Sequence, residues 1–168
     1  LPDSTEKTVS YDTYYYGQPV TAQAKPEVNG YTFVGWIFGE SGTAPDTMPN
    51  KDISATGTFS ARSATYTVNY YEQNVSGNYY TLMDDLTETL RSTHGTQISA
   101  DIADAKEIEG FSAAGVSTTK GAVGGCTAGS MTASADGVVS LVSGDKLNIN
   151  YYYTRNRYGI TLNVWKGD

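Results

Sequence analysis

The chain has few charged residues and no strongly basic segment. Charged residues make up 17% of its 168 residues, and the formal net charge is −7. Soluble globular proteins average about 25% charged residues, so uncharged polar groups must make this surface wettable, as in extracellular β-proteins. Binding to a nucleic-acid backbone depends on Lys and Arg neutralising phosphates. The acidic balance therefore argues against nucleic acid as a partner.

The chain also has a single cysteine and a single histidine, Cys126 and His94. One cysteine forms no internal disulfide, and one histidine builds no multi-histidine metal site. A catalytic thiol needs a base within hydrogen-bond reach, and Cys126 lies in a glycine-rich segment without a nearby histidine. We interpret Cys126 as an incidental thiol and His94 as a turn residue, and we expect no cofactor.

Long apolar runs are absent as well. No segment approaches the roughly 20 apolar residues that span a bilayer, and no basic segment followed by an apolar stretch opens the chain. We therefore expect no membrane insertion. The sequence reads as an interior piece of a longer protein.

The acidic residues form two groups that could suggest chemistry, since paired carboxylates hydrolyse glycosides or hold Ca²⁺. The groups are Asp84, Asp85 and Glu88, and Asp101, Asp104 and Glu107. Neither has the alternating ligands and central glycine of a Ca²⁺ loop. Spacing by three favours a solvated helix face over a metal site or a catalytic pair. We predict that the protein is not an enzyme.

Tyrosine is abundant: the aromatic residues are 14 Tyr, 4 Phe and 2 Trp. Tyrosine fits pleated, half-buried surfaces, so strands are the default expectation. Consecutive strand residues point to opposite faces, so each Tyr run must place at least one ring away from the core. The candidate ligand-contacting rings are Tyr15, Tyr71, Tyr80 and Tyr152. The favoured alternative is cross-strand ring pairing, which contributes roughly 0.2 to 1 kcal/mol per pair.

An internal repeat of about eighty residues is visible once glycines are used as anchors. The segment 16–22, YGQPVTA, reappears as HGTQISA at 94–100, and 29–35, NGYTFVG, reappears as EGFSAAG at 109–115. A third correspondence closes each unit: Thr58–Arg62 leads into Tyr66–Tyr70 as Tyr152–Arg155 leads into Ile160–Val164. Neither junction has a flexible linker, so neighbouring units should keep a fairly fixed angle.

The second unit has a pattern of strand, strand, helix, strand, strand. Alternation predicts strands at 66–71, 79–91, 138–142 and 146–153, with a turn at Gly77 and Asn78. Residues 98–109 predict a short amphipathic helix capped by Ser99 and ended by Gly110. The segment 116–137 is rich in Gly, Ala, Ser and Thr and is predicted to be an exposed insertion.

The first unit matches but is incomplete. It has a strand around Val9 and Tyr11, a helix or turn stopped by Pro26, and strands at 31–38 and 53–62 around a loop through Met48-Pro49. The predicted organisation is thus a first unit at 1–63 lacking its opening strand, a second unit at 64–157, and the opening strand of a following repeat at 158–168. The predicted fold class is α+β: tandem β-grasp (ubiquitin-like) units, mostly β with one short helix each.

Two sets of residues carry a family resemblance. The first is Tyr16-Gly17-Gln18-Pro19-Val20, Gly30-Tyr31-Thr32-Phe33-Val34-Gly35-Trp36 and Met48-Pro49-Asn50-Lys51-Asp52-Ile53. It resembles the Listeria–Bacteroides repeat, also called the internalin B-repeat. The second runs from Tyr66 to Asn74 and closes with Tyr151-Tyr152-Tyr153-Thr154-Arg155-Asn156. It is similar to MucBP-like repeats, although Ala113, Ala114 and Gly115 stand where aromatic residues are expected.

The resemblance implies a β-grasp module strung in tandem along a cell-wall-attached bacterial surface protein. Such a module acts as a stalk or spacer, with neighbouring repeats as its partners. The alternative is an adhesive module that binds host glycan, mucin or protein through exposed tyrosines. No catalytic residue comes with the resemblance.

Two further expectations concern bonds between parts of the chain. The segment Tyr158–Trp165 is a predicted strand that has no partner strand in this sequence, and exposed sheet edges can pair with such strands. We therefore expect that it can complete the first unit of another molecule, head to tail.

Lys51, Lys106 and Lys120 with nearby Asn or Asp could form an internal isopeptide bond, but ordinary surface lysines are the favoured interpretation.

Overall fold

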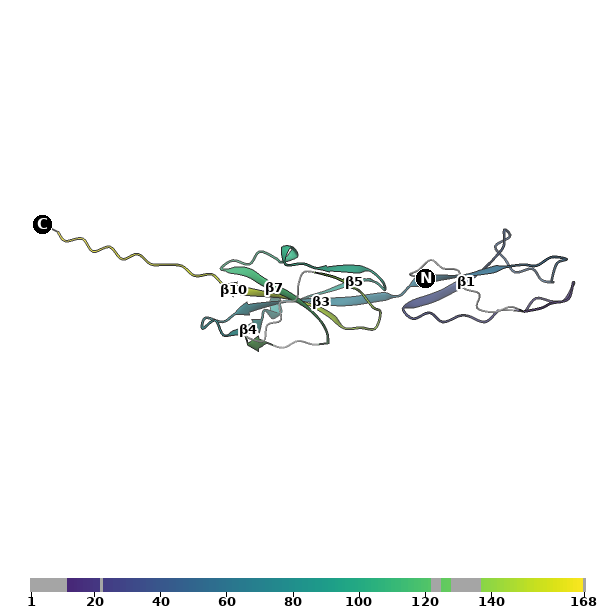
Figure 1. Ribbon diagram of the computed structural model, residues 1–168, viewed down its shortest axis with the longest axis horizontal. Helices are drawn as coiled ribbons and strands as arrows, with labels where there is room; N and C mark the ends of the chain where they lie inside the picture. Colours follow the sequence, from purple (N-terminus) through teal and green to yellow (C-terminus); the bar gives the residue numbers. More distant parts are fainter. Residues whose placement is uncertain (1–11, 22, 122–124, 128–136, 168) are drawn as a thin grey trace.

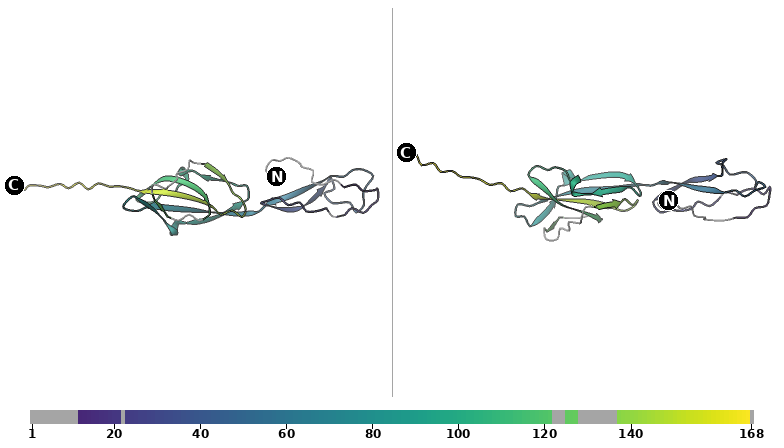
Figure 2. Two further views of the ribbon diagram at one scale, coloured as in Figure 1. Left: turned by 60° about the horizontal axis from the view of Figure 1, so that its bottom comes forward. Right: turned by 45° about the horizontal axis from the view of Figure 1, so that its top comes forward.

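The chain forms two β-units that follow each other along one axis. The computed structural model describes residues 12–21, 23–121, 125–127 and 137–167. Figures 1 and 2 show the first unit at one end, the second unit in the middle, and the last residues running outward from the second unit. The two units lie end to end in every view.

The first unit is built on an antiparallel hairpin of β1 (Tyr31–Phe38) and β2 (Ala55–Ala61). Phe33 meets both Trp36 and Phe59 edge to face, with ring centroids 5.4 Å apart in each pair. These rings are only partly buried. Between residues 12 and 62, the sole buried residue among those the structure describes is Gly30. The first unit therefore has an aromatic patch in place of a closed core.

The second unit is built on a six-stranded sheet centred on β3 (Ser63–Gln73) and β10 (Leu147–Arg155). These two strands run parallel, and all other pairings in the sheet are antiparallel. The remaining strands are β4 (Tyr79–Leu82), β5 (Glu88–Thr93), β7 (Phe111–Lys120) and β8 (Cys126–Thr127). A separate ribbon pairs β6 (Gln97–Ala100) with β9 (Gly137–Ser140).

Both faces of this sheet are buried. On one face the core residues of β3, β7 and β10 pack beneath the segment 98–108. That core consists of Val68, Tyr70, Val116, Ile149, Tyr151 and Tyr153. On the other face Tyr71, Tyr80 and Tyr152 pack together, with Leu82 and Cys126 against them. Because both faces are covered, adjacent tyrosines of one strand are buried on opposite sides.

A buried polar ladder crosses the centre of the second face. The Asn69 amide donates hydrogen bonds to the side-chain oxygens of Asn148 (3.2 Å) and Asn150 (2.9 Å). The Asn150 amide in turn donates to Ser117 Oγ (3.4 Å) and Thr119 Oγ1 (3.3 Å). A one-residue slip would place apolar side chains opposite these amides. The ladder therefore fixes the register of the three central strands.

The predicted fold class, α+β with β-grasp units that each carry a short helix, is wrong, because the described residues form a mostly β structure. The residues that the structure describes contain strands and two 3-10 turns, η1 (Asp84–Leu86) and η2 (Ile102–Asp104), but no α-helix. The predicted helix at 98–109 is instead β6, η2 and an irregular segment. Ile and Asp are weak helix formers. Asp101 also accepts a hydrogen bond from the Ala103 backbone N–H at 2.8 Å, which supports a local turn in competition with a helix.

Two other boundaries differ from the prediction. The segment predicted as an exposed insertion begins inside β7, where Val116 and Ser117 are buried next to β10. Small residues suit this position because the strand is covered on both faces. The predicted strand 79–91 is divided by η1 into β4 and β5, which pair with the same edge of β3. Val9, Tyr11 and the residues 122–124 and 128–136 lie outside the described residues.

The backbone repeats itself between the two units. Gly17 N–H donates to Met48 C=O at 2.9 Å, and Gly95 N–H donates to Leu141 C=O at 2.8 Å. Likewise, Arg62 N–H donates to Gly30 C=O (2.8 Å) as Asn156 N–H donates to Gly110 C=O (2.9 Å). All four glycines have φ between 78° and 84°. The glycine anchors of the sequence repeat therefore occupy equivalent turns.

The strand pairings of the two units share one irregularity. In the β1–β2 pair Val34 has no Cα partner, because Phe33 pairs with Phe59 and Gly35 with Thr58. In the β7–β10 pair Ala114 is skipped in the same way, between Ala113 with Tyr153 and Gly115 with Tyr152. A β-bulge bends a strand and marks a specific position. The shared bulge equates β1 with β7 and β2 with β10, residue by residue.

The buried tyrosines predict how stability responds to alkaline pH. Burial raises the pKa of Tyr71, Tyr151 and Tyr153 to about 12 in each case. The unfolded chain releases these protons at a lower pH than the folded chain does, so the free energy of unfolding falls as pH rises from 10 towards 12. Urea unfolding followed by circular dichroism should show this fall, and Tyr151→Phe should make it shallower. The exposed control Tyr15→Phe should leave the slope unchanged; equal slopes for all three proteins would contradict the assignment.

Candidate functional site at the unit junction

The described residues hold no group of three or more His, Cys, Asp or Glu side chains that could bind a metal ion. Within the same residues, no helix is long and apolar enough to cross a membrane. Two other features of the described residues have functional potential: the tyrosines, and the place where the two units meet.

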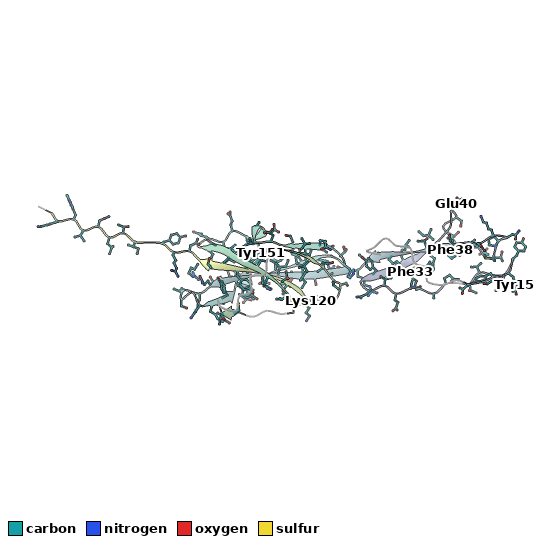
Figure 3. The ribbon with its side chains drawn as sticks, in the orientation of Figure 1. Tyr15, Phe33, Phe38, Glu40, Lys120 and Tyr151 are labelled. Carbon is teal, nitrogen blue, oxygen red and sulfur yellow. The ribbon has the colours of Figure 1, made fainter. Side chains whose placement is uncertain are left out.

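The four tyrosines predicted as ligand contacts have two different environments. Tyr71, Tyr80 and Tyr152 are buried, with exposed fractions of 0%, 2% and 4%. Tyr152 stacks on Tyr71 with ring centroids 5.2 Å apart and meets Tyr80 edge to face at 5.5 Å. Tyr15 is 87% exposed and lies at the outer end of the first unit (Figure 3). The structure thus brings three of the rings together as a packing cluster and leaves Tyr15 on the surface.

The other sequence candidates are dispersed. Lys106 pairs with Glu88, and its ammonium lies 5.0 Å from the centre of the Tyr70 ring. Lys120 pairs with Asp145 at 2.7 Å. These side chains are partly or largely exposed, and exposed pairs contribute about 0 to 1 kcal/mol. Cys126 packs at the edge of the buried tyrosine cluster and is partly exposed.

The two units are joined by a single residue. Strand β2 ends at Ala61 and β3 begins at Ser63, so only Arg62 separates a strand of the first unit from the central strand of the second. Arg62 is held on both sides: its N–H donates to Gly30 C=O and its C=O accepts from His94 N–H, both at 2.8 Å. The junction is therefore hydrogen-bonded backbone and not a free linker.

The His94 ring bridges the units. It meets the Tyr31 ring edge to face, with centroids 5.1 Å apart. The same imidazole lies against Gly30, where an added Cβ would come within 2.3 Å of its atoms. Ser143 N–H donates a hydrogen bond to His94 Nδ1 at 3.1 Å. The ring is thus fixed from the second unit and packs on the first.

A second bond supports this arrangement from the loop after β9. The Ser143 hydroxyl donates to Ser63 C=O at 3.1 Å, directly after the joining residue. The loop therefore holds both the imidazole and the start of β3. We call the set Gly30, Tyr31, Arg62, His94 and Ser143 the junction site.

Sequence reasoning found only part of the junction site. It placed His94 in a turn equivalent to Tyr16, and the structure does place it in that turn. It did not connect His94 to Gly30 and Tyr31, which belong to another anchor some sixty residues away. The usable signal in the sequence was the repeat itself, because Gly30 and His94 both lie at its glycine anchors.

One of the comparisons with known proteins gives a match, and it lies in the first unit. Residues 4–63 match the family model of the divergent InlB B-repeat domain. Comparison with curated proteins and with solved structures gives no match. The B-repeat family suggests a repeat module of an extracellular bacterial surface protein, without catalytic activity. The InlB part of the sequence resemblance is thereby supported, and the MucBP-like part stays a prediction.

The Gly30 contact gives a prediction with an internal control. Gly30→Ala places a methyl group on the His94 ring, whereas Gly110→Ala introduces the same positive-φ strain in the equivalent turn, where nothing lies within 4 Å. We expect both substitutions to cost about 1 to 2 kcal/mol from backbone strain, and only Gly30→Ala to displace the imidazole. Because His94 is the sole histidine, one imidazole proton NMR signal in an untagged chain reports its position. A signal that is unmoved by Gly30→Ala would contradict the contact.

Proposed function

We propose that this chain is a stiff, non-enzymatic spacer in the stalk of a cell-wall-attached bacterial surface protein. The observation that carries the proposal is the path of mechanical load through the second unit. The chain enters this unit at Ser63, the first residue of β3, and leaves it at Arg155, the last residue of β10. These strands are parallel neighbours, so their loaded ends lie at opposite ends of the pair.

Tension along the chain therefore shears β3 against β10. Seven consecutive positions are paired, from Leu147 with Tyr66 to Tyr153 with Glu72. In shear these pairs share the load and must yield together, whereas in peeling they break one after another. The Asn69 ladder lies within this interface, and buried hydrogen bonds strengthen in surroundings of low dielectric constant. A unit loaded in this way suits a stalk under pull.

The junction site supports the same proposal. Flexible linkers let neighbouring domains move independently, but here one hydrogen-bonded residue joins two strands and an imidazole packs across the boundary. Tension would pass from β2 directly into β3. The end-to-end arrangement in Figures 1 and 2 is the arrangement that a spacer needs.

Single-molecule force spectroscopy tests the proposal within one protein. Attachment at Ser63 and Arg155 loads the parallel pair in shear. Attachment at Ser63 and Thr93, which are antiparallel partners in β3 and β5, unzips the sheet from one end. We expect a severalfold higher unfolding force in the first geometry. Equal forces would contradict a load-bearing role.

Adhesion is a second candidate, favoured by one observation. Tyr15 and its neighbour Tyr16 are 87% and 79% exposed, and Tyr15 lies at the outer end of the first unit (Figure 3). Aromatic rings with one wet end are common at binding surfaces. In the repeat, Tyr15 and Tyr16 are equivalent to Thr93 and His94. The surface around Tyr15 and Tyr16 is therefore equivalent to the surface of the second unit that contacts the first unit.

A glycan and mucin array tests whether Tyr15 and Tyr16 bind a ligand or only form a surface that contacts a neighbouring unit. If the module is adhesive, binding should be reproducible and Tyr15→Ala should abolish it. The matched control is Val75→Ala, another exposed substitution, in the second unit. No binding by the wild-type chain, or binding that survives Tyr15→Ala, would remove the tyrosine-mediated adhesive candidate.

A further inference from the structure

The outer edge of β2 differs from its counterpart in the second unit. Strand β10 is paired on both edges, with β7 on one side and β3 on the other. Within the described residues, the equivalent strand β2 pairs only with β1. The edge that corresponds to the β3 position thus presents backbone N–H and C=O groups that can accept another strand.

The aromatic patch of the first unit lies beside this open edge. The rings of Phe33 and Trp36 lie over Gly57, where an added Cβ would come within 3.2 Å of each. Phe59 completes the patch from the same strand. In the second unit the equivalent face is closed by Tyr66, Val68 and Tyr70 of β3. Among the described residues of the first unit no strand occupies that position, and its aromatic rings are partly exposed.

The end of the chain carries the side chains that the patch lacks. Beyond β10, residues 157–167 belong to no strand pair and run outward from the second unit (Figure 1). Ile160, Leu162 and Val164 alternate along one side, and their exposed fractions are 88%, 86% and 96%. This segment follows β10 in the same way that β3 follows β2. The hydrogen bond from Asn156 N–H to Gly110 C=O is equivalent to the one from Arg62 N–H to Gly30 C=O.

We propose that residues 160–165 of one molecule add as a parallel strand to the free edge of β2 in a second copy of this chain. The pairing of β10 with β3 supplies the register. Ile149, the β10 equivalent of Ala55, pairs with Val68, the β3 equivalent of Leu162. Leu162 therefore lies beside Ala55, and Val164 lies beside Gly57 under the aromatic rings. Asn163 takes the place of Asn69 and faces the hydroxyl groups of Ser54 and Thr56.

The donor must be another molecule because the strand cannot reach its own first unit. In this register Ile160 lies beside Ile53, two residues before the start of β2. Asn156 lies at the far end of the second unit, so the chain would have to cross the lengths of β10 and β2, nine and seven residues. That distance is roughly 50 Å at about 3.3 Å per residue. The four residues from Asn156 to Ile160 span at most roughly 14 Å.

Each molecule then donates a strand at one end and receives a strand at the other. This contact is heterologous, so repeated addition produces open, linear chains and not closed dimers. In such an assembly, the strand pairing between two molecules is the same as the pairing of β10 with β3 within one molecule. The inference is independent of the force test above, which is carried out on single molecules.

Disulfide trapping tests the register. In a Cys126→Ser background, one protein carries Ala55→Cys and a second carries Leu162→Cys; they are mixed under mild oxidation. We expect rapid formation of the mixed dimer, because paired residues bring Cα atoms within disulfide range. The control pairs Ala55→Cys with Asn163→Cys, whose side chain points to the other face. Equal trapping in both mixtures, or trapping in neither, would overturn the proposal.

Light scattering after size-exclusion chromatography tests the assembly without cross-links. The apparent mass of the unmodified chain should rise with concentration beyond that of a dimer. Leu162→Asp should return it to the monomer mass, because the carboxylate would lie against the aromatic patch. Thr161→Asp, one residue away and facing the polar side, should keep the assembly. A wild-type monomer at all concentrations, or equal loss in both variants, would show that strand addition does not occur.

Discussion

The parallel pairing of β3 with β10 is the contact on which the rest of the second unit depends. The two strands lie about eighty residues apart in sequence. Every other strand of the sheet pairs with one of them, except β8, which pairs with β4. β7 pairs with β10, while β4 and β5 pair with β3. Parallel strands need a long crossover between them, and here that crossover carries β6, η2 and the loop that covers the first face.

This pairing also explains the tyrosines. A sheet with one wet face would leave alternate rings exposed, but this sheet is covered on both faces, so Tyr70 and Tyr71 are both buried. Rings from β3 and β10 then stack in pairs, Tyr70 with Tyr151 and Tyr71 with Tyr152, at 5.7 and 5.2 Å between centroids. Cross-strand aromatic pairs of this kind stabilise a sheet. Most of the tyrosines in the second unit therefore serve to pack the sheet.

Sequence patterns predicted the features that depend on local alternation and on turn glycines. The strand 31–38 is confirmed at both ends, and the anchor glycines at 17, 30, 95 and 110 all lie in turns with positive φ. The prediction was wrong at 98–109, where apolar residues have helical spacing but form no helix. Ile102, Ala105 and Ile108 do pack on the core, but they reach it from a 3-10 turn and extended backbone. Apolar spacing alone does not distinguish these conformations.

The sequence by itself determined the repeat, its anchors and the direct passage from one unit into the next, because these follow from local backbone requirements of glycine and from the order of strands. The tertiary structure decided which tyrosines face water, which residue touches the neighbouring unit, and which sheet edge stays open. Those properties depend on what covers each face and edge, and the covering residues come from distant parts of the chain. The junction of His94 with Gly30 is the clearest case: each residue is a local turn signal, and only folding brings the two turns together.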